Sequence, residues 1–146
     1  MLHRTISAVI DRPVRDVFGL LSDVEKTPVW HPAGVEERWT SEPPVGVGST
    51  RIAVEKVFGT QFENEAVVTV FEPYRALGLK SISGPVPFEV DIRLTPLGAS
   101  TRIEWKTQMR PEGFYRVIVP ITFRFFIRQL ESGLDNLKRL METEAL

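Results

Sequence analysis

The stretch that decides the fold of this chain is ITFRFFIRQLESGLDNLKRLMETE, residues 121–144. At 100° per residue, one side of a helix through it is apolar and the opposite side is polar or charged. We therefore expect one long amphipathic helix over residues 120–145, roughly 35 Å long at about 1.5 Å per residue. A helix of that length needs a sheet to cover its apolar side. That side carries Phe123, Phe126, Ile127, Leu130, Leu134, Leu137 and Met141, and the polar side carries Arg128, Glu131, Ser132, Asp135, Arg139 and Glu142.

Two features of this predicted helix go beyond ordinary packing. Gly133 lies at the margin of the apolar side, in a helix interior where glycine costs about 1 kcal/mol relative to alanine. We expect either a close approach of backbone there or an empty volume beneath the helix. Toward the start, Ile118, Ile121 and Phe125 point away from the main apolar side and make that end apolar nearly all round. A lid or a protein partner is expected to cover it.

Length and composition limit the class of protein. The 146 residues, 42% hydrophobic and 25% charged, indicate a single domain over residues 1–146 with a substantial core. The formal net charge of −1 gives no argument for binding nucleic acid or an anionic membrane. There is no cysteine, which excludes disulfides and thiolate chemistry. The absence of a signal-peptide pattern and of any run of about 20 apolar residues predicts a cytoplasmic protein without stable membrane insertion.

The rest of the sequence predicts an antiparallel sheet. Alternating apolar and polar residues indicate strands at 4–10, 35–41, 49–58, 61–72, 76–83, 87–95 and 101–109, separated by glycine and proline turns. A short helix that begins near Pro13 and a further helical turn from Asp23 through Lys26 follow the first strand. Residues 110–119 are expected to be irregular and to hang over one end of a cavity. The order predicts an α+β helix-grip fold, a seven-stranded antiparallel sheet wrapped around a long C-terminal helix, with two short helices after strand 1.

Several segments resemble a known superfamily. They are ISAVIDRPVRDVFGLLSDVEKTPVWHPAGV (6–35), VTVFEPYRAL (68–77), LTPLGASTRIEWK (94–106) and the C-terminal helix. Together they resemble the START-like helix-grip superfamily (SRPBCC), in its polyketide cyclase/dehydrase and lipid-transport branch. These motifs are specific for architecture and weak for chemistry. The resemblance implies a ligand cavity between sheet and helix, in a family that ranges from carriers of apolar molecules to aromatase/cyclases, hydratases and partner-binding domains.

Candidate site residues follow from chemistry and expected position. His31 is the one catalytic candidate, because an imidazole exchanges protons near neutral pH, although it could equally be a surface residue or satisfy nearby backbone. Arg51 would anchor a carboxylate or enolate if odd positions of its strand face inward, whereas Ile52 and Val54 favour the even positions. Glu63 and Glu65 share one strand face and could perform acid/base work if burial separated their pKa values, but a solvated outer face is favoured because Gln61 and Thr69 lie on the same face. The full set of predicted ligand contacts is Trp30, His31, Arg51, Phe88, Trp105, Phe123, Phe126 and Leu130.

Three functions remain open at this level. The first is binding, transport or sequestration of a small hydrophobic or aromatic molecule or lipid. The second is a polyketide cyclase/dehydratase-like enzyme that works without a cofactor. The third is a module that binds a protein partner, with a homodimer as the expected assembly. Two distant histidines and no cysteine give no metal site, and no nucleotide-binding motif is present, so we expect no cofactor.

Overall fold

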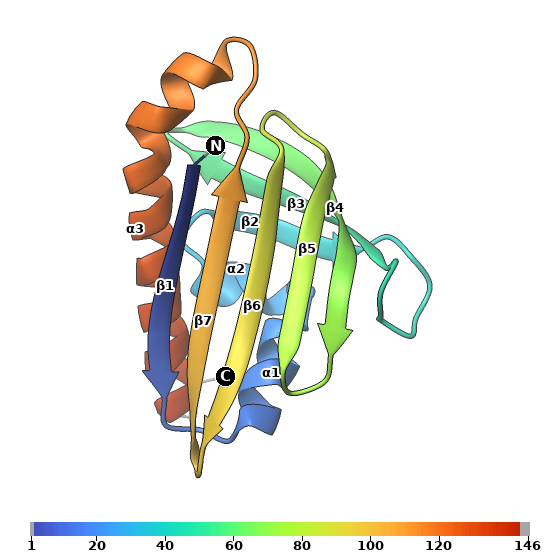
Figure 1. The fold of residues 1–146 in the computed structure, drawn as a ribbon, viewed down its shortest axis with the longest axis vertical. Helices are drawn as coiled ribbons and strands as arrows, with labels where there is room; N and C mark the ends of the chain where they lie inside the picture. The colour runs from blue at the N-terminus through green and yellow to red at the C-terminus, as the bar shows by residue number, and fades with distance from the viewer. Residues whose placement is uncertain (1, 144–146) are drawn as a thin grey trace.

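The computed structural model describes residues 2–143 and confirms the predicted helix-grip fold (Figure 1). Seven strands form one antiparallel sheet in the order β1-β7-β6-β5-β4-β3-β2. The sheet is a meander from β2 to β7, closed by β1 beside β7. In Figure 1, β2 and β3 cross behind the nearly vertical β6 and β7, so the sheet curls. The strands are β1 (Leu2–Ile10), β2 (Gly34–Trp39), β3 (Thr50–Val57), β4 (Thr60–Glu72), β5 (Ala76–Ser83), β6 (Phe88–Leu97) and β7 (Ser100–Met109).

The helices are α1 (Val14–Leu21), the 3₁₀ turn η1 (Val24–Lys26), the one-turn α2 (Thr27–Trp30) and the long α3 (Tyr115–Glu142). The first two were predicted, whereas α2 was not. Pro13 is the residue that precedes α1, and Asp11 does not cap it. No helix within residues 2–143 is both long and apolar enough to span a membrane.

The predicted start of the long helix was wrong. α3 begins at Tyr115 and runs through Pro120, so only Arg110–Phe114 remain as a loop before it. Pro120 is a poor N-terminal marker here because Val119 is buried against the rest of the protein. Tertiary packing therefore extends the helix upstream of the proline, although proline removes one backbone hydrogen bond. The predicted end lies partly outside the described residues, because Glu144 and Ala145 are not among them.

The core lies between the C-terminal half of α3, the short helix α1 and the inner face of the sheet. Leu134, Leu137 and Met141 pack into one cluster with Ile10 and Ile103 from β1 and β7. Full burial of each such side chain contributes about 1.5–3 kcal/mol. Packing in this core therefore stabilises the position of the C-terminal half of α3 on the sheet.

The alternation that predicted β7 holds in the structure. Its odd positions face the interior, where Thr101, Ile103 and Thr107 are buried, and the even positions from Arg102 to Lys106 are exposed. One face of this strand is therefore covered and the other is wet, as the sequence pattern indicates.

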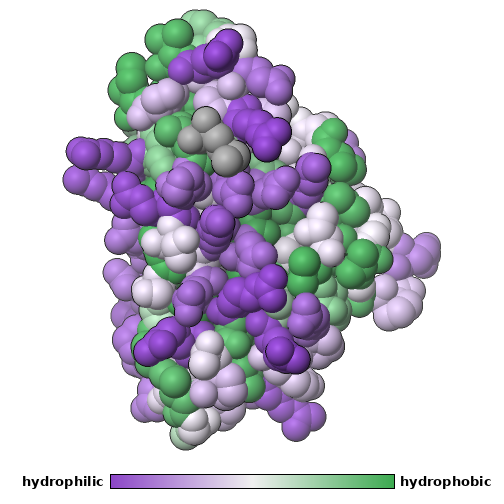
Figure 2. Space-filling view, in the orientation of Figure 1, coloured by the Kyte–Doolittle hydropathy of each residue, from purple (hydrophilic) through white to green (hydrophobic). Residues whose placement is uncertain are grey.

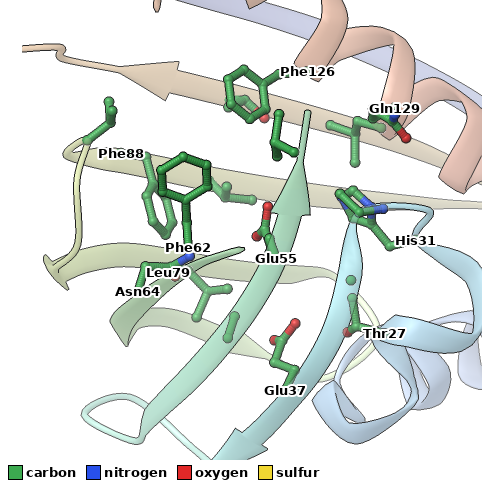
Figure 3. Close-up of a pocket in the computed structure, with 18 of the residues that line it drawn as sticks. Thr27, His31, Glu37, Glu55, Phe62, Asn64, Leu79, Phe88, Phe126 and Gln129 are labelled. Carbon is green, nitrogen blue, oxygen red and sulfur yellow. The ribbon is translucent and has the colours of Figure 1, made fainter. Parts of the chain in front are cut away.

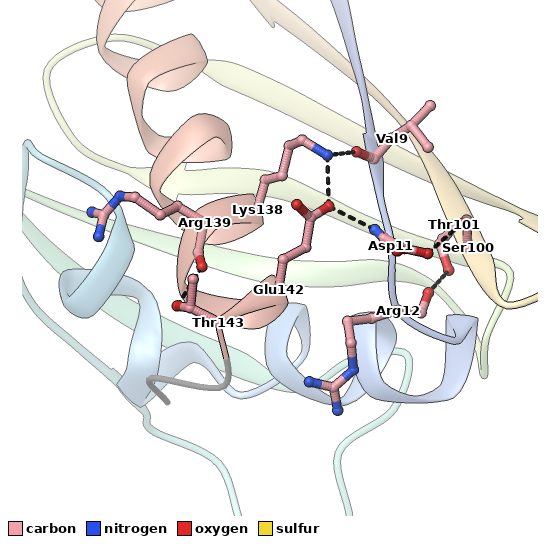
Figure 4. A network of polar contacts seen from close by, with 9 residues as sticks. All are labelled: Val9, Asp11, Arg12, Ser100, Thr101, Lys138, Arg139, Glu142 and Thr143. Carbon is pink, nitrogen blue, oxygen red and sulfur yellow. Dashed lines mark hydrogen bonds and ion pairs between the residues drawn. The ribbon is translucent and has the colours of Figure 1, made fainter.

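Polar contacts anchor the C-terminal end of α3 (Figure 4). Lys138 Nζ donates to the carbonyl of Val9 at 2.8 Å, and the backbone N–H of Asp11 donates to Glu142 Oε2 at 2.8 Å. Arg12 Nη1 donates to the carbonyl of Met141 at 2.9 Å. The hydrogen bond from Lys138, followed by that from Asp11, lowers the pKa of Glu142. This end of α3 is thus bound to the first strand and the loop after it.

Gly133 neither borders an empty volume nor contacts mainly backbone. A Cβ atom at this position would lie 3.3 Å from two atoms of the Trp30 ring and 3.5 Å from the Cα of His31. The glycine therefore lets the ring of Trp30, from α2, pack against α3. This contact places the adjacent His31 next to the helix.

The side chains that face the interior lie at odd positions in β3 and at even positions in β4. Arg51, Ala53 and Val57 of β3 are buried, and so are Ala66 and Val68 of β4. The preference for even positions in β3 was therefore wrong. Ile52 and Val54 are only half-buried on the opposite face.

Candidate ligand-binding site

A cavity of about 350 Å³ lies between the sheet and the N-terminal half of α3 (Figure 3). Its volume is near the lower end of the range of small-molecule pockets. Most of its wall is apolar. The apolar lining includes Phe62 from β4, Leu77 and Leu79 from β5, Phe88, Val90 and Ile92 from β6, Trp105 from β7, and Phe126, Ile127 and Leu130 from α3.

Strand register brings these side chains together. Ile92 of β6 pairs with Trp105 of β7 and with Leu77 of β5, and Val90 pairs with Leu79 and Thr107. Paired residues in an antiparallel sheet point to the same face. One alternating pattern in three neighbouring strands therefore builds a continuous wall opposite α3.

A polar corner interrupts the wall where β2, β3 and β4 meet. Arg51 is 5% exposed, and its Nε lies 3.3 Å from Glu37 Oε2. This separation makes an ion pair although the Nε–H lacks good hydrogen-bond geometry. Arg51 Nη1 donates to Asn64 Oδ1, and the guanidinium lies 5.8 Å from the centre of the Phe88 ring. A buried cation is therefore held at the cavity by a carboxylate, an amide and an aromatic face.

Burial shifts the pKa of two ionisable groups that line the cavity, Glu37 and His31. Burial raises the pKa of Glu37 to about 7; Arg51 opposes that shift, Glu55 adds to it, and a hydrogen bond with the Thr27 side chain opposes it. Burial also lowers the pKa of His31, and Glu55 opposes this change. Near neutral pH, Glu37 exchanges its proton and His31 is neutral.

His31 has a structural contact as well as a place in the cavity wall. Its Nδ1 accepts a hydrogen bond from the backbone N–H of Ala33 at 3.2 Å. The neutral ring then carries its proton on Nε2. From the sequence, a hydrogen bond to the backbone and a place in the cavity wall were alternative roles for His31. In the structure His31 has both.

Three further buried polar atoms on the cavity residues have no hydrogen-bond partner within the described residues. They are Trp30 Nε1, Trp105 Nε1 and Thr107 Oγ1. An unpaired buried donor costs about 1–3 kcal/mol. The two indole nitrogens can only donate. The cavity is therefore apolar overall, and because these three atoms have almost no accessible surface, a ligand acceptor would reach them only after a small side-chain movement.

The structure brings seven of the eight predicted contact residues to this cavity: Trp30, His31, Arg51, Phe88, Trp105, Phe126 and Leu130. Phe123 is buried but does not line the cavity. Three residues along a helix amount to a rotation of about 60°, which separates Phe123 from Phe126 on the wide buried side of α3. That these residues contact a ligand stays a prediction.

Sequence reasoning missed several cavity residues. Thr107 shares the odd positions of Trp105 and was recognisable on that basis. Glu37 was not, because Glu36 and Glu37 are adjacent and the pairing of β2 with β3 shifts between Gly34 and Glu36. Glu63 and Glu65 do not line the cavity. Within residues 2–143 no three histidine, aspartate or glutamate side chains cluster in a way that could hold a metal ion.

Known structures share this fold. TTHA0849 from Thermus thermophilus has a TM-score of 0.81 at 14% identity, covering 94% of this chain and 95% of that one. A START superfamily protein from Mycobacterium smegmatis has a TM-score of 0.77 at 13% identity, covering 95% and 98%. The Zhui aromatase/cyclase from Streptomyces has a TM-score of 0.74 at 16% identity, covering 96% and 95%. Such low identities establish the fold alone.

Sequence comparison establishes the family. None of the curated proteins matches the chain. The family described as polyketide cyclase / dehydrase and lipid transport matches residues 1–142, which is nearly the whole sequence and agrees with the resemblance seen in its motifs. The chain therefore belongs to the polyketide cyclase/dehydrase and lipid transport family, with START/SRPBCC helix-grip structures as its structural neighbours.

Proposed function

We propose that this chain binds a small, largely apolar molecule, aromatic or lipid-like, that carries oxygen acceptors. The observation that carries the proposal is the pairing of an apolar cavity of about 350 Å³ with unpartnered donors on Trp105 and Thr107. Burial of apolar ligand surface supplies about 25 cal/mol per Å². A ligand carbonyl or hydroxyl would satisfy the donors and fix the orientation.

The polar corner adds a second anchor for an acidic ligand group. Arg51 is already paired with Glu37, so an incoming carboxylate competes with a carboxylate of the protein. When Glu37 takes up a proton, the guanidinium charge is no longer compensated by it. Because the pKa of Glu37 is about 7, an anionic ligand should bind more tightly below neutral pH.

A ligand screen tests this function. Native mass spectrometry and thermal shift with fatty acids, flavonoids and 1-anilinonaphthalene-8-sulfonate (ANS) should give one-to-one complexes. Thr107→Val should weaken those with acceptor oxygens, whereas Thr95→Val, on the exposed face of the neighbouring strand, should not. If no apolar compound binds, or if both variants behave alike, the proposed site is wrong.

A cofactor-independent cyclase/dehydratase-like activity is the second candidate. It is favoured by a carboxyl of pKa about 7 and a neutral imidazole on one cavity wall. A general base works best when its pKa lies near the operating pH. Under this alternative Glu37→Gln and His31→Gln would abolish turnover of a bound polyketone while leaving its affinity within a few-fold. Unchanged turnover in both variants would rule it out.

A further inference from the structure

The first half of α3 is apolar on two opposite faces. At 100° per residue, Val119, Phe123 and Ile127 point toward the sheet, and Val117 and Ile121 point the other way. The former are buried, whereas Val117 is 69% exposed and Ile121 is 77% exposed. The outward face, with the residues beside it, forms what we call the apical patch: Phe58, Phe114, Val117, Ile118, Ile121 and Phe125.

Phe58 extends the apical patch from the helix to the sheet. It occupies the turn between β3 and β4 with φ of 51°, a conformation that is uncommon for a bulky residue. Its ring is 66% exposed, and it stacks on Phe125 with the ring centres 4.4 Å apart. The turn thus exposes an aromatic ring to solvent beside the helix. Packing within this protein does not explain why an aromatic residue occupies this position.

The apical patch is continuous with the cavity. Phe58 and Ile118 belong to both, and both are exposed, so the cavity reaches the surface between the β3–β4 turn and α3. An occupant of the apical patch would therefore lie directly over the cavity mouth. A ligand that enters the cavity through this mouth would therefore pass beside the apical patch.

Charge decides what kind of occupant fits. Between Arg110 and Leu130 there are four arginines (110, 116, 124 and 128) and one acidic residue, Glu112, a net charge of +3 (4 − 1). The whole chain carries −1, so the remainder carries −4 (−1 − 3). The net charge of the whole chain is small because the positive charge of residues 110–130 and the negative charge of the remainder nearly cancel. The whole-chain value therefore gave no argument for an anionic membrane.

Two of the arginines continue the outward side of the helix beyond the apolar residues. On the helix, Arg124 and Arg128 project within about 60° of Val117 and Ile121, and both are exposed. Apolar residues bordered by arginines are typical of helices that lie in the interface of an anionic bilayer. A two-fold homodimer through the same surface would instead bring like charges together. Figure 2 shows green, hydrophobic residues at the top of the molecule, over the first turns of α3, beside purple, hydrophilic side chains.

We propose that the apical patch docks on the surface of an anionic lipid bilayer, with its apolar side chains in the headgroup boundary and Arg124 and Arg128 on the lipid phosphates. The cavity mouth then faces the acyl chains, and an apolar ligand passes between bilayer and cavity without crossing water. The more acidic remainder of the chain faces away. This docking goes beyond ligand binding and does not depend on the ligand's identity.

Vesicle flotation tests the docking. The wild-type protein should float with vesicles in which phosphatidylglycerol replaces a third of the phosphatidylcholine, bind phosphatidylcholine alone weakly, and dissociate as salt is raised. The Val117→Ser/Ile121→Ser double variant should bind the vesicles at least about tenfold more weakly than the wild type. The Arg124→Gln/Arg128→Gln variant should lose the preference for phosphatidylglycerol. Ile82→Ser removes a 56% exposed side chain outside the patch and should bind as the wild type does.

Three outcomes would overturn the proposal. One is no flotation with either vesicle, and another is an equal loss in the Ile82→Ser control. The third is sedimentation of the wild type as a dimer that the double variant converts to a monomer without any vesicle association, which would assign the patch to a second copy. A one-to-one flavonoid complex that Thr107→Val weakens in the absence of vesicles separately reports the cavity, so failure of docking and failure of ligand binding are distinguishable.

Discussion

The carboxylate of Glu37 lies 3.3 Å from Nε of Arg51, and both side chains are buried beside the cavity. Burial raises the pKa of Glu37 from 4.5 to about 7. The folded protein therefore holds this proton at a pH where the unfolded chain has released it. The resulting stability is fully present below about pH 4.5 and is lost as the pH rises through about 7. The loss is on the order of 3 kcal/mol.

Glu37→Gln should remove this pH dependence. Urea unfolding at about pH 5 and about pH 8 should show a smaller difference in the free energy of unfolding than the wild type does. The glutamine keeps a similar shape but does not ionise. Identical pH dependence in the two proteins would contradict the assignment of the raised pKa to Glu37.

Arg51→Met should destabilise the protein at neutral pH. The contacts of the guanidinium with Glu37 and Asn64 are lost at a cost of about 1–3 kcal/mol, and Glu37 itself stays protonated because Arg51 no longer lowers its pKa. The cost should shrink at about pH 5, where Glu37 is neutral. Arg38→Met is the matched control, since Arg38 forms an exposed pair with Glu36 on the adjacent strand. Arg38→Met should lower the free energy of unfolding by less than about 1 kcal/mol in the same chemical denaturation experiment.

Thr107→Val should have opposite effects on stability and affinity. The buried hydroxyl has no partner within the described residues, so the isosteric methyl group should stabilise the free protein by about 1 kcal/mol. A ligand oxygen that accepts from this hydroxyl would lose about one hydrogen bond, or roughly tenfold in affinity. Calorimetric unfolding and ligand titration measure the two quantities. A destabilised free protein would indicate that the hydroxyl is satisfied by the fold.

Gly133→Ala should destabilise the fold although alanine favours helices by about 1 kcal/mol. The added Cβ would lie 3.3 Å from the Trp30 ring, which must move away from α3. Overpacking of this kind costs about 1–3 kcal/mol. Gly19→Ala in α1 is the control, because nothing lies within 4 Å of its added Cβ, and it should stabilise the protein. A stabilised Gly133→Ala protein would mean that Trp30 does not pack there.

Sequence patterns predicted the strands well because one face of the sheet is buried and the other is wet. Strands β4, β5 and β7 begin and end within a residue of the predicted positions. The pattern failed for Arg51 because the cavity, rather than an apolar core, lies on its face of β3, so a polar residue faces inward. The raised pKa of Glu37 reflects its burial and its interactions with Arg51, Glu55 and Thr27, which lie on other elements and which periodicity does not encode.

The ends of the long helix illustrate the same limit. Local rules place a helix start near a proline, but α3 begins at Tyr115 because Val119 packs against the sheet side of the structure. The Trp30 contact at Gly133 likewise joins residues about a hundred positions apart. The composition did indicate that the start of the helix was apolar on more than one side, and the structure separates this into a buried face and the exposed apical patch.

We expect an apolar ligand to occupy the space between α3 and the sheet. Because ANS could also bind the apical patch, a crystal structure grown with ANS shows which of the two places it occupies. We predict density for the naphthalene rings between Phe126 and Trp105, with the sulfonate toward Arg51. Density only on the exposed surface around Phe58 and Ile121, with an unoccupied interior, would show that the cavity is not the ligand site.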